Sequence, residues 1–269
     1  MSNLLEEIRE VNIPEDLANL FSLNGYTSVV TGGASGLGEA IALGLAVFGS
    51  NVILLDINYE NLERVRKRVE NIGRQCTAMT LDVTSWESVS RAADMVRDLC
   101  GAPDVLVNSA GMNIRKPALE LSPKEFIKVV NVDLTGTFLC CKAFGALMAA
   151  RGQGSVINLS SINAHVALEK NSAYGAAKGG VVQLTRVLAL EWARYNVRVN
   201  ALSPAHHKTP LVEQMAKDPD WYANLIRMIP QGRFAQAHEI IGPTIFLASR
   251  ASSFTTGTSM LTDGGWTMV

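Results

Sequence analysis

The stretch "TSVVTGGASGLGEA", Thr27 to Ala40, decides the fold class of this chain. A short apolar run typical of a buried strand leads into glycines at positions 32, 36 and 38, and a helical pattern follows at once. Those glycines allow a tight turn and let backbone N–H groups approach a ligand closely. A pyrophosphate at the N-terminus of the following helix would gain from these amides and from the helix dipole. The stretch therefore predicts a strand–turn–helix unit that binds a dinucleotide.

Outward from this unit, short apolar runs alternate with amphipathic runs of helical length. We expect strands over residues 27–33, 51–56, 75–83, 104–111, 154–161, 197–204 and 257–265. We expect helices over residues 37–49, 58–73, 85–100, 123–151, 174–195 and 238–249, with Ser85 capping the third. Such alternation predicts a parallel sheet covered on both faces. No linker or composition break is visible, so we expect one doubly wound, Rossmann-like α/β domain over residues 24–269, after an extension at 1–23.

The composition excludes several classes of protein. The formal net charge of the 269 residues is −1, so no electrostatic case exists for binding nucleic acid or an anionic membrane. No apolar run looks long enough to span a bilayer, and the acidic N-terminus lacks the features of a signal peptide. The cysteines show no metal-ligand spacing and are expected to be reduced thiols: Cys76, Cys100, Cys140 and Cys141. These features predict a cytoplasmic protein.

An acidic residue, Asp56, ends the second expected strand about 20 residues after the glycines. A carboxylate at this place accepts hydrogen bonds from the ribose hydroxyls of NAD and repels the 2′-phosphate of NADP. No Arg or Lys lies within the turn or at positions 57–59. We therefore predict that NAD is preferred over NADP. The alternative is that Asp56 only caps a loop.

Five motifs follow one another along the chain. They are TGxxxGxG at 31–38, "NSAG" at 108–111, Asn131 in "VVNVDLTGTF", Ser161 in "NLSS", and Tyr174 with Lys178 in "YGAAK". Together they resemble the short-chain dehydrogenase/reductase family, from about Leu23 to the C-terminus. Tyr and Lys four residues apart share one face of a helix, where by themselves they usually serve packing and solvation. The order and spacing of the other motifs favour a catalytic pair.

The resemblance implies a role for each of four catalytic residues. A free phenol, with a pKa near 10, is a poor base at neutral pH, and a neighbouring cation stabilises its phenolate. Tyr174 would exchange the substrate's hydroxyl proton, and Lys178 would supply that cation and bind the nicotinamide ribose. Ser161 would hydrogen-bond and polarise the substrate oxygen. Asn131 would hold a water near Lys178 for proton relay.

The resemblance also implies the contacts with the dinucleotide, with Asp82 and Val83 at the adenine. The full set is Gly32, Ser35, Gly36, Leu37, Gly38, Asp56, Ile57, Asp82, Val83, Asn108, Ala110, Gly111, Tyr174, Lys178, Pro204 and Thr209. Simpler interpretations stay open for three residues. Asp82 could cap the approach to a helix, Asn131 could mark a helix irregularity, and Ser161 could be a strand-end cap next to Ser160.

Three polar segments are expected to shape the substrate site: residues 112–119, 162–173 and 203–222. The substrate residues predicted from them and from the catalytic set are Arg115, Ser161, Asn163, His165, Tyr174 and His206. A polar lining suits a hydroxylated substrate better than a steroid or an acyl chain. The chain looks most like the gluconate and other sugar-acid or polyol dehydrogenases. Arg115 could clamp a carboxylate or could be an ordinary solvated loop residue.

One departure from the family pattern follows the sixth expected strand. The family usually has Pro-Gly and then apolar or aromatic residues, whereas this chain has Pro204-Ala205-His206-His207. Two imidazoles thus replace side chains that are commonly aromatic in the sugar-acid branch, which bears on specificity. Adjacent histidines point in different directions and have no evident carboxylate partner nearby, so we predict no metal site.

These observations predict an NAD-dependent oxidoreductase that interconverts a secondary alcohol and a ketone on a sugar, sugar acid or polyol. One alternative is an NADPH-dependent reductase of small ketones or 3-oxoacyl thioesters. Another is a nucleotide-sensing protein without turnover. The resemblance also implies a homotetramer or dimer that packs through two long helices, and the segment "VVQLTRVLALEW" is apolar enough for a second buried face.

Overall fold

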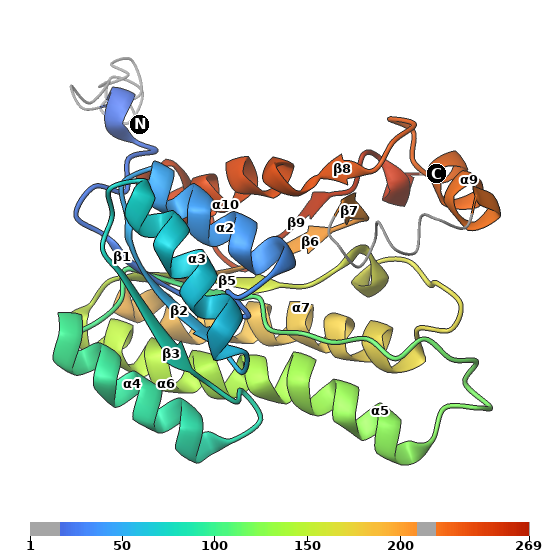
Figure 1. Ribbon diagram of the computed structural model, residues 1–269, viewed down its shortest axis with the longest axis horizontal. Coiled ribbons are helices and arrows are strands. Elements are labelled where there is room, and N and C mark those ends of the chain that lie inside the picture. Colours follow the sequence, from blue (N-terminus) through green and yellow to red (C-terminus); the bar gives the residue numbers. More distant parts are fainter. Residues whose placement is uncertain (1–16, 209–218, 269) are drawn as a thin grey trace, which may run out of the picture.

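A computed structural model describes residues 17–208 and 219–268 and contains a seven-stranded parallel sheet (Figure 1). Its strand order is β3-β2-β1-β4-β5-β6-β9. The strands are β1 (Thr27–Thr31), β2 (Asn51–Asp56), β3 (Cys76–Thr80), β4 (Val105–Asn108), β5 (Gly154–Leu159), β6 (Val197–Pro204) and β9 (Ser259–Thr262). The order reverses between β1 and β4, the point at which doubly wound folds bind their ligands. The predicted fold class is confirmed.

Helices cover both faces of the sheet, as Figure 1 shows. One face carries α2 (Gly36–Val47), α3 (Tyr59–Asn71) and α10 (Ile241–Ala248). The other carries α4 (Trp86–Cys100), α6 (Gly136–Arg151) and α7 (Ser172–Trp192). Each layer buries its own apolar cluster against the strands, because the central strands present apolar side chains to both faces of the sheet. Leu23, which the sequence assigns to the extension, is fully buried in the first of these clusters.

Local capping explains where several helices begin. Ser85 caps α4 as predicted, and its hydroxyl accepts the Ser88 N–H at 3.2 Å. Ser122 and Glu125 form a capping box at the start of α5 (Pro123–Val130). The predicted helix over 123–151 forms, but a π-helical turn, η2 (Asn131–Thr135), separates α5 from α6. Such turns inside helices are often found at functional sites.

The helical segment Pro123–Arg151 is long and apolar enough, by length and composition, to cross a membrane. The expectation that no apolar run reaches that length is therefore wrong on these two criteria. In the fold, 44% of its apolar window is buried inside the protein. Cys140, Phe144 and Met148 are fully buried in the core beneath the sheet. The segment thus packs as a core helix that covers one sheet face.

A smaller apolar cluster lies beyond the end of β6. It joins Ile162, Ile229, Phe234 and Trp266. The elements around it are η3 (Ile162–Ala164), β7 (His207–Lys208), α9 (Pro219–Arg227), β8 (Ala235–Gln236), η5 (Ala237–Ile240) and η7 (Trp266–Met268). The two short strands β7 and β8 pair in parallel as a separate sheet. The remaining short helices are η1 (Leu17–Asn19), η4 (Ala193–Tyr195) and η6 (Arg250–Ser252).

Candidate active site

The glycine turn between β1 and α2 is packed too tightly for other residues. Gly32 and Gly36 have positive φ angles of 66° and 57°, which favour glycine. A Cβ on Gly38 would lie 2.1 Å from the carbonyl oxygen of Gly32, and one on Gly32 would lie 2.6 Å from the Ala110 nitrogen. Ser35 occupies the N-cap of α2 without a side-chain cap hydrogen bond. The first amides of α2 therefore have no side-chain cap of that kind to compete with an anion.

Replacing Gly38 by Ala is expected to weaken NADH binding about tenfold or more, because the new Cβ collides with the Gly32 carbonyl and displaces the turn whose amides would hold the pyrophosphate. Fluorescence titration with NADH measures the effect. Gly242→Ala is the matched control, because a Cβ at that helical position meets no atom within 4 Å. Thermal melts of both variants show whether they fold. Unchanged NADH affinity in a folded G38A protein would contradict the assignment of this turn.

Asp56 lies at the carboxyl end of β2, beside the glycine turn. One carboxylate oxygen accepts the Ala34 N–H at 3.2 Å, and the other accepts the Asn58 N–H at 3.0 Å. Asp56 therefore does cap the backbone of these loops, as the alternative interpretation held. The side chain is only half-buried, so its remaining lone pairs stay accessible to a ribose hydroxyl. Ile57, the next predicted contact, is 74% exposed.

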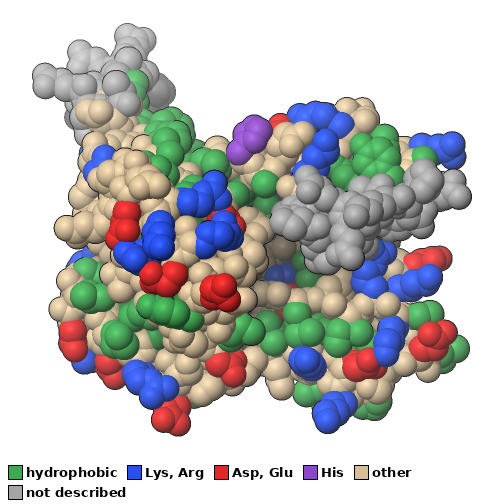
Figure 2. Space-filling model, viewed as in Figure 1, with side chains coloured by type: hydrophobic (Ala, Val, Ile, Leu, Met, Phe, Trp, Pro, Cys, Tyr) green, Lys and Arg blue, Asp and Glu red, His purple; other side chains and the backbone are tan. Residues whose placement is uncertain are grey.

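Two arginines that the sequence analysis missed lie next to the same turn. Arg64 of α3 donates to the Ala34 carbonyl at 3.1 Å and pairs with Glu39 at 2.6 Å, and Arg68 also pairs with Glu39. Burial tends to raise the pKa of Glu39, but the two guanidinium groups outweigh it and lower that pKa. Figure 2 shows Lys and Arg side chains interspersed with acidic ones over α2 and α3. Positive charge thus lies near the position expected for the adenosine ribose.

The other predicted cofactor residues lie along the carboxyl edge of the sheet, with two differences. Asp82 is exposed and accepts hydrogen bonds from the N–H and hydroxyl of Thr84, at 2.9 and 2.7 Å, so it does cap its loop. Asn108 is buried and its amide nitrogen donates to Asn158 at 2.8 Å, which ties β4 to β5, while its amide oxygen has no hydrogen-bond partner among the described residues.

The other predicted cofactor residues differ in how far they are exposed to solvent. Val83, Pro204 and Leu37 are buried or half-buried, Ser35 and Gly111 are exposed, and the Ala110 N–H lies 3.4 Å from the Thr31 hydroxyl. Thr209 lies outside the described residues.

Ser161 and its neighbour Ser160 make different hydrogen bonds. Ser160 is buried, and its hydroxyl donates to the Lys178 carbonyl at 2.9 Å, which fixes the strand end to α7. Ser161 caps η3, and its hydroxyl accepts the Asn163 N–H at 3.2 Å. Since Ser161 accepts in that bond, its own proton is left to donate to a substrate oxygen. The geometry supports the choice of Ser161 over Ser160.

Tyr174 and Lys178 lie one turn apart on α7, close to the end of β5. The Lys178 ammonium nitrogen lies 5.4 Å from the centroid of the Tyr174 ring. It also donates to the Leu159 carbonyl at 2.8 Å. Tyr174 is half-buried, whereas Lys178 is only 4% exposed. The phenol is therefore reachable from the crevice, and the ammonium is held behind it.

The structure does not bring Asn131 to this site. Asn131 is exposed, whereas Asp133, two residues further along η2, is fully buried. A carboxylate oxygen of Asp133 lies 3.2 Å from the Lys178 nitrogen. Residues two apart on a helix point in nearly opposite directions, so Asn131 and Asp133 do not share a face. The role predicted for Asn131 therefore has no geometric support, and Asp133 is the η2 residue that contacts Lys178.

Burial and pairing act in opposite directions on these two groups. Burial favours the neutral amine of Lys178, but the charge of Asp133, and then that of Tyr174, outweighs burial and raises the pKa of Lys178. Burial raises the pKa of Asp133, and the Lys178 charge and the Met112 N–H oppose that rise. The two side chains form a buried acid–base pair.

The predicted substrate segments line two cavities. One cavity, of about 450 Å³, is lined by residues 163–168 and 170–172, with Ala118 and Gly175. Asn163 and His165 contribute to it, and the Asn163 amide oxygen is buried without a hydrogen-bond partner among the described residues. The His165 ring nitrogen lies 3.0 Å from the Ser259 hydroxyl. Arg115 is exposed on the segment between β4 and α5.

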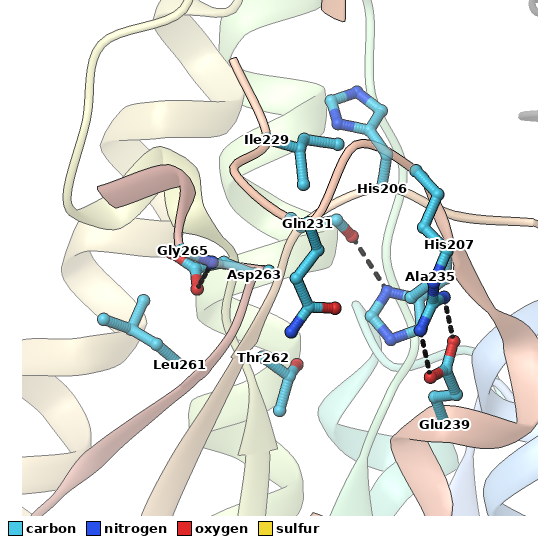
Figure 3. Close-up of a pocket in the computed structure, with 13 residues that line it drawn as sticks. His206, His207, Ile229, Gln231, Ala235, Glu239, Leu261, Thr262, Asp263 and Gly265 are labelled. Carbon is cyan, nitrogen blue, oxygen red and sulfur yellow. Dashed lines mark hydrogen bonds and ion pairs between the residues drawn. The ribbon is translucent and has the colours of Figure 1, made fainter. Parts of the chain in front are cut away.

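The second cavity, of about 340 Å³, is drawn in Figure 3 and includes Ala205, His206 and His207. His206 stacks on Phe234 and Trp266, with ring centroids 5.3 Å away in both cases. Burial, followed by the charges of Arg115 and His207, lowers the pKa of His206 to about 4. The His206 imidazole is therefore neutral at physiological pH. Among residues 17–208 and 219–268, no three His, Cys, Asp or Glu side chains gather as a metal site.

Comparisons with known proteins agree with this geometry. Residues 32–267 match the family described as "Enoyl-(Acyl carrier protein) reductase". D-threitol dehydrogenase of Mycolicibacterium smegmatis is 40% identical, over 92% of this chain and 95% of that protein. Gluconate 5-dehydrogenase of Gluconobacter oxydans is 33% identical, over 93% and 98% of the two chains. A Burkholderia cenocepacia gluconate 5-dehydrogenase, solved with NADP and tartrate, is 33% identical with a TM-score of 0.90, over 93% and 98% of the two chains.

The chain belongs to the short-chain dehydrogenase/reductase family. It is an NAD(P)-dependent oxidoreductase that acts on CH–OH groups.

Proposed function

We propose that this protein is an NAD-dependent dehydrogenase that oxidises a secondary alcohol on a sugar, sugar acid or polyol, or reduces the ketone. One observation supports the proposal: the Lys178 nitrogen lies 5.4 Å from the Tyr174 ring centroid and donates to the Leu159 carbonyl, where β5 ends two residues before Ser161. This is the sheet edge at which β1 also ends and leads into the glycine turn. The names of the relatives support the substrate class. We place the protein in the cytoplasm, as an enzyme with a small polar substrate.

The residues at the β1–α2 turn fit a dinucleotide. The glycines bring the backbone close and the uncapped first turn of α2 suits a pyrophosphate, while Asp56 suits ribose hydroxyls. When bound, the nicotinamide supplies the hydride acceptor or donor. The chain's own residues have to bind the substrate, orient it, and move one proton.

Tyr174 transfers that proton, and Lys178 and Ser161 assist the transfer. Tyr174 takes it from the substrate hydroxyl while the carbinol carbon becomes a carbonyl, and returns it in the reverse reaction. The Lys178 ammonium, 5.4 Å from the centre of the ring, stabilises the phenolate form of Tyr174. The Ser161 hydroxyl donates to the same substrate oxygen and orients it toward Tyr174.

The cavity walls favour a substrate with several hydroxyl groups. The Asn163 amide oxygen lacks a hydrogen-bond partner among the described residues and is an acceptor, and the neutral His206 ring adds a polar group to the second cavity. An apolar acyl chain would leave these polar groups without hydrogen-bond partners. A negatively charged sugar acid would find Arg115 on the segment that precedes α5.

Asp56 favours NAD, whereas Arg64 and Arg68 are the residues that could favour NADP. A 2′-phosphate would meet the Asp56 carboxylate but could recruit the two arginines from Glu39. The Burkholderia relative was solved with NADP. We favour NAD because both guanidinium groups already pair with Glu39, while the Asp56 carboxylate stays half-exposed.

Replacing Asp56 by Asn is expected to lower kcat/KM with NAD about tenfold and to raise it with NADP, because a ribose hydrogen bond weakens and a repulsive charge disappears. Initial rates with both cofactors measure the ratio. Glu60→Gln is the matched control, since Glu60 is an exposed acid at the start of α3 and the charge change is the same. An unchanged ratio in D56N would overturn the assignment of Asp56.

The substrate class is tested by a screen of the purified protein. NADH formation at about 340 nm is followed with sugar acids, sugars, polyols and simple secondary alcohols, each with NAD and with NADP. Turnover of one polyhydroxylated group with NAD supports the proposal. Turnover of only simple alcohols, ketones or thioesters, with NADP(H), would favour the reductase alternative instead.

We also propose a homotetramer or dimer that packs through the long helices. Large apolar side chains are exposed there: Phe138 of α6 is 41% exposed, and Val187 and Leu190 of α7 are 43% and 83% exposed. A second subunit would cover them. Sedimentation of the purified protein gives the number of subunits.

A further inference from the structure

Asp133 forms a buried ion pair with Lys178 but has no part in the proton transfer proposed above. Asp133 has no exposed surface and Lys178 has 4%. A carboxylate oxygen of Asp133 lies 3.2 Å from the Lys178 nitrogen. Burying a charged carboxyl group is unfavourable because it loses its hydration, unless an oppositely charged partner offsets that loss. Its presence in an apolar helix, beside a candidate catalytic lysine, therefore calls for a function.

The surroundings hold Asp133 in one position. Its other carboxylate oxygen accepts the Met112 N–H at 2.7 Å, which anchors it to the segment that follows β4. Gly111 lies against it, and a Cβ at that position would come within 3.2 Å of the oxygen that faces Lys178. The π-helical turn η2 carries Asp133 toward α7. One carboxylate oxygen is thus hydrogen-bonded to the backbone. The other is buried with no hydrogen-bond partner among the described residues, and the ion pair with the lysine is what offsets its charge.

We propose that Asp133 is the counter-ion that keeps Lys178 protonated and fixed beside Tyr174. Asp133 is a positioning residue in this account, because it acts on the substrate only through Lys178. Its catalytic consequence rests on the proposed function.

The physical reason lies in how few charges face Lys178. Among the described residues, the titratable groups that act on it are Asp133 from η2 and Tyr174 from its own helix, while the Leu159 carbonyl accepts one N–H. Without Asp133, burial would act on the ammonium with little opposition and would favour the neutral amine. A neutral Lys178 would no longer stabilise the Tyr174 phenolate.

Asp133→Asn tests this through the pH profile of alcohol oxidation. In the wild type, the Asp133 charge raises the pKa of Lys178, so we expect the lysine to stay charged, and the activity to hold, into the alkaline range. In D133N that pKa falls, and we expect the alkaline loss of kcat/KM to begin about one pH unit lower or more. Asp104→Asn is the matched control, because Asp104 forms an ion pair with Arg151 near the opposite end of the sheet. An unchanged alkaline limb in D133N would overturn the proposal.

A second measurement needs no substrate and covers the case in which D133N fails to fold. The side-chain nitrogen of Lys178 is followed by NMR in wild-type protein labelled with ¹⁵N-lysine, and assigned by the signal missing from Lys178→Arg. An ammonium signal that persists through pH 10, about the ordinary lysine value, supports the proposal. An amine signal at that pH overturns it. Because this readout does not depend on turnover, a failed substrate screen leaves the test of the pair intact.

Discussion

Tyr174→Phe is expected to lower kcat/KM for alcohol oxidation about 10³-fold, within the range that a positioned acid–base group supplies. The change removes one hydroxyl and keeps the ring, so the packing of α7 and the binding of NADH are expected to survive. Stopped-flow or steady-state rates give the loss, and fluorescence titration gives the NADH affinity. Thermal melts should overlay, because Tyr174 is only half-buried.

Tyr195→Phe is the control for Tyr174→Phe. Tyr195 lies just beyond the other end of α7, in η4, and is 38% exposed, so loss of its hydroxyl should leave the rate unchanged. Wild-type turnover in Y174F would remove Tyr174 from the mechanism. Loss of NADH binding together with turnover would show that the residue holds the cofactor instead of moving the proton.

Lys178→Met is expected to cost about 10²-fold or more in kcat/KM and to destabilise the fold by about 3 kcal/mol. The activity falls because the cation next to Tyr174 is lost. The stability falls for a different reason, since the buried Asp133 carboxylate is left without a partner. Denaturant unfolding and rate measurements separate the two effects.

A double variant tells the two causes apart. Asp133→Asn combined with Lys178→Met removes the unpaired charge, so stability should return toward the wild type while activity stays low. Lys142→Met, at an exposed position of α6, is the control for loss of a lysine. If the double variant is no more stable than K178M, the ion pair does not account for the loss.

The sequence predicts most of the fold because its periodicity and its turn chemistry agree. "TSVVTGG" and "NVILLD" are apolar on both faces, as strands of a covered parallel sheet must be, and glycines mark the turn. Expected strands 104–111 and 257–265 are longer than β4 and β9, because pairing with the neighbouring strands ends at Asn108 and Thr262. The short strands β7 and β8 have no periodic signal at all, since two residues are too few to show one.

The site shows where one-dimensional reasoning stops. Tyr174 and Lys178 are one turn apart, so helical geometry alone places them together. Asn131 and Asp133 are both polar residues in an apolar helix, and only the three-dimensional fold shows which one faces α7. A usable signal existed, because a carboxylate in an apolar run such as "VDLTGTFLCC" needs a buried cation, and Lys178 was available.

Arg64 illustrates a second limit. It follows the turn residue Ala34 by 30 positions, and the packing of α3 beside α2 brings it to the Ala34 carbonyl. A search for basic residues near the turn in the sequence cannot find it. The choice between NAD and NADP therefore depends on a balance between Asp56 and a pair of arginines from another helix.

The central claim is that a hydride leaves the carbinol carbon of a polyhydroxylated substrate for NAD. The most direct test uses the best substrate of the screen, deuterated at the carbon to be oxidised, with unlabelled NAD. We predict that mass spectrometry finds one deuterium in the NADH formed, and that Tyr174→Phe slows its appearance about 10³-fold. Reduced cofactor without deuterium, or oxidation of the substrate with no reduced cofactor, would contradict it.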